Sequence, residues 1–151
     1  MPGFLVDTNI LVYLYDQQSS DKQSQALILL DYLAQEHLGI VSTQMLAEFF
    51  WVATRKLANP LTLDEATTSV NRYLDTWVVL DVTAAVIREA CRGVQAYQLP
   101  YWDAQIWAVA HLHQISVVLS EDFQNSQVIE GVRFLNPFLP AFELAEWMPN
   151  Q

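Results

Sequence analysis

The sequence predicts a single α/β domain in which a mostly parallel sheet of about five strands is covered by helices on both faces. Short apolar runs alternate along the chain with segments that carry apolar residues at helical spacing, the pattern of strands joined by crossover helices. A length of 151 residues suits one domain, and a composition that is 52% hydrophobic supplies a sizeable core. The sequence shows no repeat, low-complexity tract or Gly/Ser linker that would divide it.

Five apolar runs have the length and composition of buried strands. The clearest is Ile-Ser-Val-Val-Leu at residues 115–119, and the first, Phe-Leu-Val, comes almost at the start of the chain. Their β-branched and aromatic residues favour extended backbone. In chain order, the predicted strands cover residues 4–6, 40–41, 78–80, 115–119 and 132–134.

Helices are predicted between these strands from apolar spacing and capping residues. Gly39 is expected to stop the second helix, Ser42 or Thr43 to cap the third, and Thr62 to form a capping box with Glu65 at the fourth. The predicted helices cover residues 9–15, 23–38, 43–57, 62–74, 83–97 and 102–113. The core stripe of the last helix is expected to consist of Trp102, Ile106, Val109 and Ala110.

Composition also indicates where the protein works. Cys91 is the only cysteine, so no internal disulfide can form; we expect a small core residue in a helix and a reducing, cytoplasmic environment. No apolar run reaches the roughly 18–20 residues that a membrane span requires, and the N-terminus has no signal-peptide pattern.

The charge balance is strongly acidic, with 17 Asp and Glu residues against 7 Lys and Arg and a net charge of −10. Nucleic-acid binders usually show a basic footprint instead. Two interpretations compete: the acids coat a soluble surface, or several of them converge in a pocket whose repulsion a divalent cation relieves. Only the positions of the acids can decide between these interpretations.

Four acids follow the predicted strands closely. Asp7 comes directly after the first strand and Asp122 shortly after the fourth; Glu48 and Asp103 lie in the first turns of helices. Ligand sites of parallel α/β sheets form at the carboxyl ends of the strands, near a switch in strand order. The sequence therefore predicts that these four carboxylates converge at one edge of the sheet.

Clustered carboxylates suit phosphodiester chemistry. They raise one another's pKa values and are stable as anions mainly with a cation between them, and Mg²⁺ prefers such oxygen ligands. A bound divalent ion can polarise a phosphodiester and activate water. Each acid alone has a simpler interpretation, because Asp7 could cap a helix, Asp103 could favour a helix dipole and Glu48 could pair with Arg55. Asp122 and its neighbour Glu121 could be turn residues.

Other candidate residues carry weaker signals. The histidines at 37, 111 and 113 show no metal-ligand pattern, since the last two face different sides of a helix. The aromatic stretches around residues 49–51 and 101–102 are expected in the core or at a dimer interface. The seven basic residues are scattered and form no legible patch.

Four short motifs in order resemble those of PIN-domain nucleases, particularly the VapC-type toxins of bacterial toxin–antitoxin pairs. They are VDTNIL at residues 6–11, STQMLAEF at 42–49, YWDAQI at 101–106 and LSEDF at 119–123. The resemblance covers roughly residues 3–138. It predicts a PIN-like nuclease domain at 1–138, with residues 139–151 as a C-terminal tail that packs on the domain or faces a partner.

The resemblance implies a three-layer α/β/α sandwich, Mg²⁺ or Mn²⁺ as cofactor, and endonucleolytic cleavage of RNA. It assigns the acidic, metal-binding site to Asp7, Glu48, Asp103 and Asp122. Asn9 and Ser120 become supporting polar residues, and Glu121 an additional ligand. It also implies a homodimer that a small cognate antitoxin inhibits, in a type II toxin–antitoxin pair.

Two alternatives stay open at this point. One is a PIN-like module that dimerises or binds RNA without turnover. The other is a phosphatase that begins with a strand ending in Asp, but that chemistry needs a second Asp two positions later, where this chain has Asn9.

Overall fold

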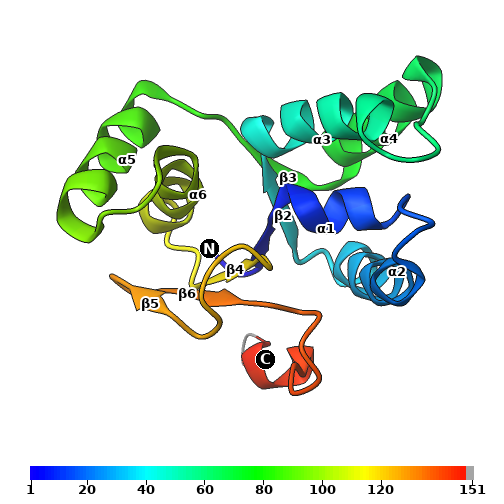
Figure 1. Ribbon diagram of the computed structural model, residues 1–151. Helices are drawn as coiled ribbons and strands as arrows, with labels where there is room; N and C mark the ends of the chain where they lie inside the picture. The colour runs from blue at the N-terminus through cyan, green and yellow to red at the C-terminus, as the bar shows by residue number, and fades with distance from the viewer. Residues whose placement is uncertain (149–151) are drawn as a thin grey trace.

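The computed structural model describes residues 1–148 and folds them around one mixed sheet (Figure 1). The strands are β1 (Phe4–Val6), β2 (Gly39–Ser42), β3 (Val78–Leu80), β4 (Val117–Leu119), β5 (Val128–Ile129) and β6 (Val132–Leu135). The helices are α1 (Thr8–Tyr13), α2 (Ser20–Gln35), α3 (Thr43–Arg55), α4 (Leu63–Thr76), α5 (Ala84–Tyr97), α6 (Tyr101–Leu112) and the 3₁₀-helix η1 (Leu144–Trp147).

The sheet has six strands in the order β3-β2-β1-β4-β6-β5. All neighbouring pairs are parallel except β5 and β6, which form an antiparallel hairpin. The turn of this hairpin is Glu130-Gly131, both with positive φ, as a tight two-residue hairpin requires. The predicted mostly parallel sheet is confirmed; the additional strand β5 has only two residues, too short to show in an apolar pattern.

The strand order places the helices in two layers. From β1 through β2 to β3 the chain steps outward in one direction, and it then crosses back over the sheet to form β4 on the other side of β1. Because crossovers are right-handed, helices that connect strands stepping in one direction lie on one face of the sheet. Helices that connect strands stepping in the other direction lie on the opposite face. Accordingly α5 and α6 cover one face, while α1 to α4 lie on the other (Figure 1). The three-layer sandwich is confirmed.

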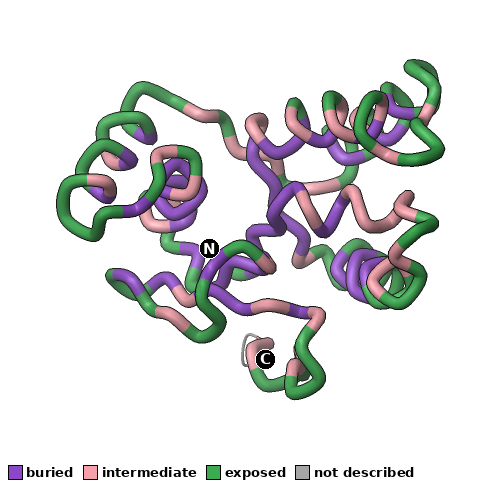
Figure 2. Tube along the Cα trace, viewed as in Figure 1, coloured by how far each residue is buried: buried purple, intermediate pink, exposed green. Residues whose placement is uncertain are grey.

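The core lies between these layers, and β1, β2 and β4 are buried at every residue (Figure 2). Two expectations about the core are wrong. Cys91 is exposed, because it lies on the outer side of α5. Trp102 is 63% exposed, because it lies in the first turn of α6, ahead of the stretch 104–110 that is buried between α5 and the sheet.

Local signals place most element boundaries. Ser42 caps α3, and Thr62 and Glu65 form the predicted capping box of α4, with hydrogen bonds of 3.1 and 3.0 Å. The predicted stop at Gly39 is wrong. The helix ends at Gln35, His37 takes the left-handed conformation with φ 55°, and Gly39 begins β2.

Gly39 serves a packing purpose instead. A Cβ atom at this position would lie 2.5 Å from the ring of Trp77, which covers the start of β2. We expect the Gly39→Ala substitution to destabilise the fold by about 1–3 kcal/mol, the usual cost of overpacking. Urea unfolding measures this cost. In a Trp77→Leu background the cost should shrink, and an equal cost in both backgrounds would contradict the steric explanation.

The C-terminal segment packs on the domain. Phe142, Leu144 and Trp147 contact the hydrophobic core, and the Arg133 guanidinium lies 5.1 Å from the centre of the Trp147 ring. The last three residues of the predicted tail, 149–151, lie outside the described residues. No helix within residues 1–148 combines the length and apolarity needed to cross a bilayer.

Candidate active site

Asp7 occupies the point where the strand order switches. In the parallel pair of β1 and β4, Val6 lies opposite Leu119, so Asp7 and Ser120 leave the sheet side by side. The Asp7 backbone N–H donates to the Leu119 carbonyl at 2.9 Å. The site therefore begins at the carboxyl ends of the two central strands, where the sequence places it.

Asp7 is 4% exposed, and each oxygen of its carboxylate accepts one hydrogen bond. Its Oδ1 accepts the Thr8 backbone N–H at 2.7 Å, and its Oδ2 accepts the Ser120 hydroxyl at 2.6 Å. Burial raises the pKa of Asp7 to about 6, although these two hydrogen bonds oppose the rise. The charges of Asp122 and Glu48 raise the pKa further.

Ser120 connects two of the predicted acids. Its hydroxyl donates to Asp7 and accepts the backbone N–H of Asp122 at 3.1 Å. The Asp122 carboxylate accepts the Asn9 side-chain amide at 3.0 Å. Ser120 and Asn9 thus hold Asp7 and Asp122 in place by hydrogen bonds.

Glu48 reaches the same edge from α3. Thr8 Oγ1 donates to its Oε2 at 3.1 Å, and Gln44 Nε2 donates to its Oε1 at 2.9 Å. Because Thr8 directly follows Asp7, the first of these bonds ties α3 to the end of β1.

Asp103 completes the group from the first turn of α6. Partial burial raises its pKa, and the charges of Asp122 and Glu48 raise it further. Asp7 and Asp103 are therefore both in the field of Asp122 and Glu48. Asp7, Glu48 and Asp122 line one cavity, and Asp103 lies within the electrostatic influence of the last two; that the four form one metal site stays a prediction.

A cavity of about 390 Å³ opens beside Asp7, Glu48 and Asp122, whereas Asp103 is not among the residues that line it. It is lined by Asp7, Thr8, Asn9, Val12, Tyr13, Asp16, Glu48, Val52, Leu57 and Asp122. Asp16 was not predicted; it follows α1 with no motif around it, and only the turn at the end of that helix brings it here.

Glu121 has other partners. It accepts the Tyr13 hydroxyl and forms an ion pair of 2.7 Å with Lys22. Both carboxylate oxygens are engaged by these donors, which keep the loop after β4 attached to α1 and α2. Its role as an additional ligand stays a prediction.

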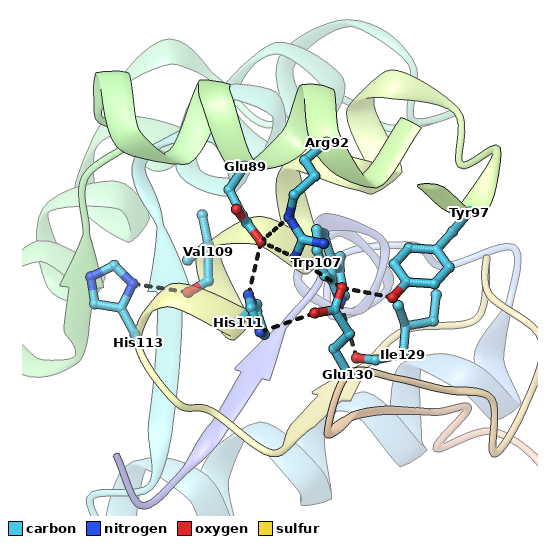
Figure 3. Close-up of polar contacts among 9 residues, drawn as sticks. All are labelled: Glu89, Arg92, Tyr97, Trp107, Val109, His111, His113, Ile129 and Glu130. Atoms are coloured by element: carbon cyan, nitrogen blue, oxygen red, sulfur yellow. Dashed lines mark hydrogen bonds and ion pairs between the residues drawn. The ribbon is translucent and has the colours of Figure 1, made fainter. Parts of the chain in front are cut away.

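A second polar cluster, drawn in Figure 3, lies between α5, α6 and the β5–β6 turn. Arg92 pairs with Glu89 and with Glu130, and His111 Nδ1 lies 3.0 Å from Glu89. His113 instead contacts the Val109 carbonyl and points away from His111 (Figure 3). The two histidines face different sides, as the sequence indicates, and this cluster ties the hairpin to the helical layer.

The acidic site has the donor atoms of a hard divalent cation. All its candidate ligands are oxygens, and among the described residues Asn9 Oδ1 is a buried side-chain oxygen without a hydrogen-bond partner. Within residues 1–148, no group of three or more His, Cys, Asp or Glu side chains is arranged so that it could hold a metal ion. Mg²⁺ commonly takes one or two carboxylates and keeps several waters, so this donor set fits it.

Comparison with known proteins identifies the fold. The PIN-domain family model matches residues 4–129. The chain belongs to the PIN-domain family. The search of curated proteins finds no match to this PIN domain.

Solved structures share the architecture of this PIN domain. A toxin–antitoxin complex from Klebsiella pneumoniae matches with 20% identity and a TM-score of 0.64, over 89% of this chain and 98% of that one. VapC20 from Mycobacterium tuberculosis gives 20% and 0.64, over 87% and 99%. DNA-bound VapBC from Salmonella typhimurium gives 19% and 0.60, over 89% and 97%.

Proposed function

We propose that this PIN domain is a metal-dependent endoribonuclease and the toxin of a type II toxin–antitoxin pair. The observation that supports the proposal is the cavity at the switch point of the sheet, which Asp7, Glu48 and Asp122 line, with Asp103 in the electrostatic field of the last two. A buried carboxylate with a pKa of about 6 costs stability, which a purely structural position would avoid. A cation between the acids would remove that cost.

In this proposal Asp7 and Asp103 hold Mg²⁺ or Mn²⁺, and Glu48 and Asp122 complete the ligand set or orient water. When bound, the ion supplies charge to polarise an RNA phosphodiester and to activate water. The chain's own residues prepare the acids: Ser120 and the Thr8 N–H fix Asp7, while Asn9 fixes Asp122. These contacts leave little rearrangement for the moment of reaction.

RNA as the substrate is supported by a structural neighbour. The VapC20 structure is described as a toxin that cleaves the sarcin–ricin loop, an RNA element. With a net charge of −10, this chain has no general attraction for RNA. The bound cation would therefore provide the local positive charge at the scissile phosphate.

A basic antitoxin is the proposed partner. Neighbouring structures are toxin–antitoxin complexes, and the acidic charge suits a basic partner. An apolar groove of about 510 Å³ between α2 and the C-terminal segment offers a seat for an apolar helix. Exposed Ile28 and Tyr32 form one wall of this groove, and Leu139 and Phe142 lie opposite. Binding and inhibition by the product of the adjacent reading frame test this partner.

We also propose a homodimer. Trp51 and Trp102, at 50% and 63% exposure, are the large aromatic residues that support an interface. Light scattering of the purified chain measures the oligomeric state; a monomer at micromolar concentration would contradict the dimer.

The enzyme is tested with purified protein and a structured RNA. Cleavage at discrete sites is expected with Mg²⁺ or Mn²⁺, and none after chelation with EDTA. Restoring the ion should restore cleavage. Divalent-ion binding without any cleavage of many RNAs would favour the alternative, a PIN-like module that binds without turnover.

A further inference from the structure

Three side chains form a continuous hydrogen-bond chain from α6 to Glu48. The Tyr101 hydroxyl donates to Gln105 Oε1 at 3.0 Å, and Gln105 Nε2 donates to Gln44 Oε1 at 2.6 Å. Gln44 Nε2 then donates to Glu48 Oε1 at 2.9 Å. Every link points toward the carboxylate, so each bond polarises the next one in the same direction.

Gln105 is the unusual member of this chain. It is 4% exposed and lies in the buried stretch 104–110 of α6, whose other members are apolar. Burying an amide is unfavourable unless its hydrogen bonds are made, and leucine would fill the same space without that cost. The amide of Gln105 therefore serves to make the hydrogen bonds to Tyr101 and Gln44.

The chain connects the two helices that carry acids of the site. Asp103 lies two residues before Gln105 on α6, and Glu48 lies four residues after Gln44 on α3. The other oxygen of Glu48 accepts Thr8 Oγ1, next to Asp7. Glu48 is thus held by Gln44, which Gln105 of α6 contacts in turn, and by Thr8 after β1.

We propose that Gln105, acting through Gln44, is a positioning residue that fixes the Glu48 carboxylate for the divalent cation, an inference that rests on the proposed function. Without the chain, Glu48 regains its rotamers and the negative field of the neighbouring acids turns it toward solvent. Residues that orient metal ligands typically contribute 10–100-fold to metal affinity.

The test is the Mn²⁺ affinity of the full chain, measured by calorimetry without RNA. Gln105→Leu and Gln44→Leu are each expected to raise the Mn²⁺ Kd about 10-fold. Tyr101→Phe removes one distant hydroxyl and should raise it about 3-fold. Gln95→Leu, at an exposed position of α5, is the matched control and should leave the Kd unchanged.

A double-variant cycle distinguishes positioning from general loosening. If Gln105 acts through Gln44, the Gln44→Leu/Gln105→Leu protein should bind Mn²⁺ no more weakly than either single variant. Additive losses, or wild-type affinity in both single variants, would overturn the inference and leave the proposed function intact. A wild-type protein that does not bind Mn²⁺ would overturn both. Should Gln105→Leu fail to fold, the Mn²⁺ Kd of Gln44→Leu decides, because Gln44 is only half-buried. A wild-type Kd in that variant would overturn the inference, since Gln105 acts through Gln44.

Discussion

The Asp7→Asn variant is expected to lose RNA cleavage and to gain stability at neutral pH. Asparagine keeps the size of the side chain, and its oxygen can still accept the Thr8 N–H that begins α1. It removes the negative charge that the proposed cation requires. The loss of activity should exceed the 10–100-fold that residues behind the ligands contribute.

The gain in stability follows from the raised pKa of Asp7. In the unfolded chain Asp7 ionises near its usual pKa of 3.8, whereas in the folded protein it ionises at about 6. Between pH 3.8 and pH 6 the folded protein keeps a proton on Asp7 that the unfolded chain has released. The stability that this protonated carboxyl contributes is fully present below pH 3.8 and is lost as the pH rises through 6. The total loss of folding stability is about 3 kcal/mol, and the Asp7→Asn protein avoids this loss because an amide does not ionise.

Urea unfolding of both proteins at pH 4 and pH 7.5, without divalent ions, measures this difference. Asp7→Asn should be nearly neutral at pH 4 and stabilising by about 3 kcal/mol at pH 7.5. Asp31→Asn is the control, because this exposed aspartate accepts a hydrogen bond from Gln35 that asparagine can also accept. A variant less stable than wild type at pH 7.5 would contradict the assignment, as would retained cleavage.

The sequence predicted the sheet, and the proximity of Asp7 and Asp122, for the same reason. Strand ends of a parallel sheet share an edge, so Asp7 and Asp122 could be placed together from strand positions alone. Exposure was harder to predict. Trp102 is exposed and Cys91 faces outward, because the burial of α5 and α6 depends on how the two helices pack against each other and the sheet.

Contacts between side chains distant in the chain were beyond prediction. Gln44 and Gln105 lie 61 residues apart, and no spacing rule relates them. Glu121 lies beside Asp122 in the motif, but the two side chains have different partners. The Glu121 carboxylate accepts hydrogen bonds from Tyr13 and Lys22. The motifs thus located the backbone that carries the four candidate acids, while the surrounding hydrogen bonds required coordinates.

Divalent cations are expected to stabilise the protein strongly at pH 7.5 and weakly at pH 5. An ion that binds only the folded state at 100 times its Kd contributes about 2.7 kcal/mol, which raises Tm by roughly 5–10 °C for a chain of this size. The dependence on pH arises because ligands must be deprotonated, and Asp7 holds its proton below about pH 6.

Thermal unfolding with Mn²⁺ or with NaCl of equal ionic strength separates binding from screening. NaCl should reproduce little of the shift, because the acids are partly withdrawn from solvent and the effect needs a bound ion. The Asp7→Asn variant already lacks the buried charge, so Mn²⁺ should raise its Tm much less than that of wild type. An equal shift at pH 5 and pH 7.5, or an equal shift in both proteins, would mean that the cation binds elsewhere. The buried charge of Asp7 would then serve a purpose other than metal binding.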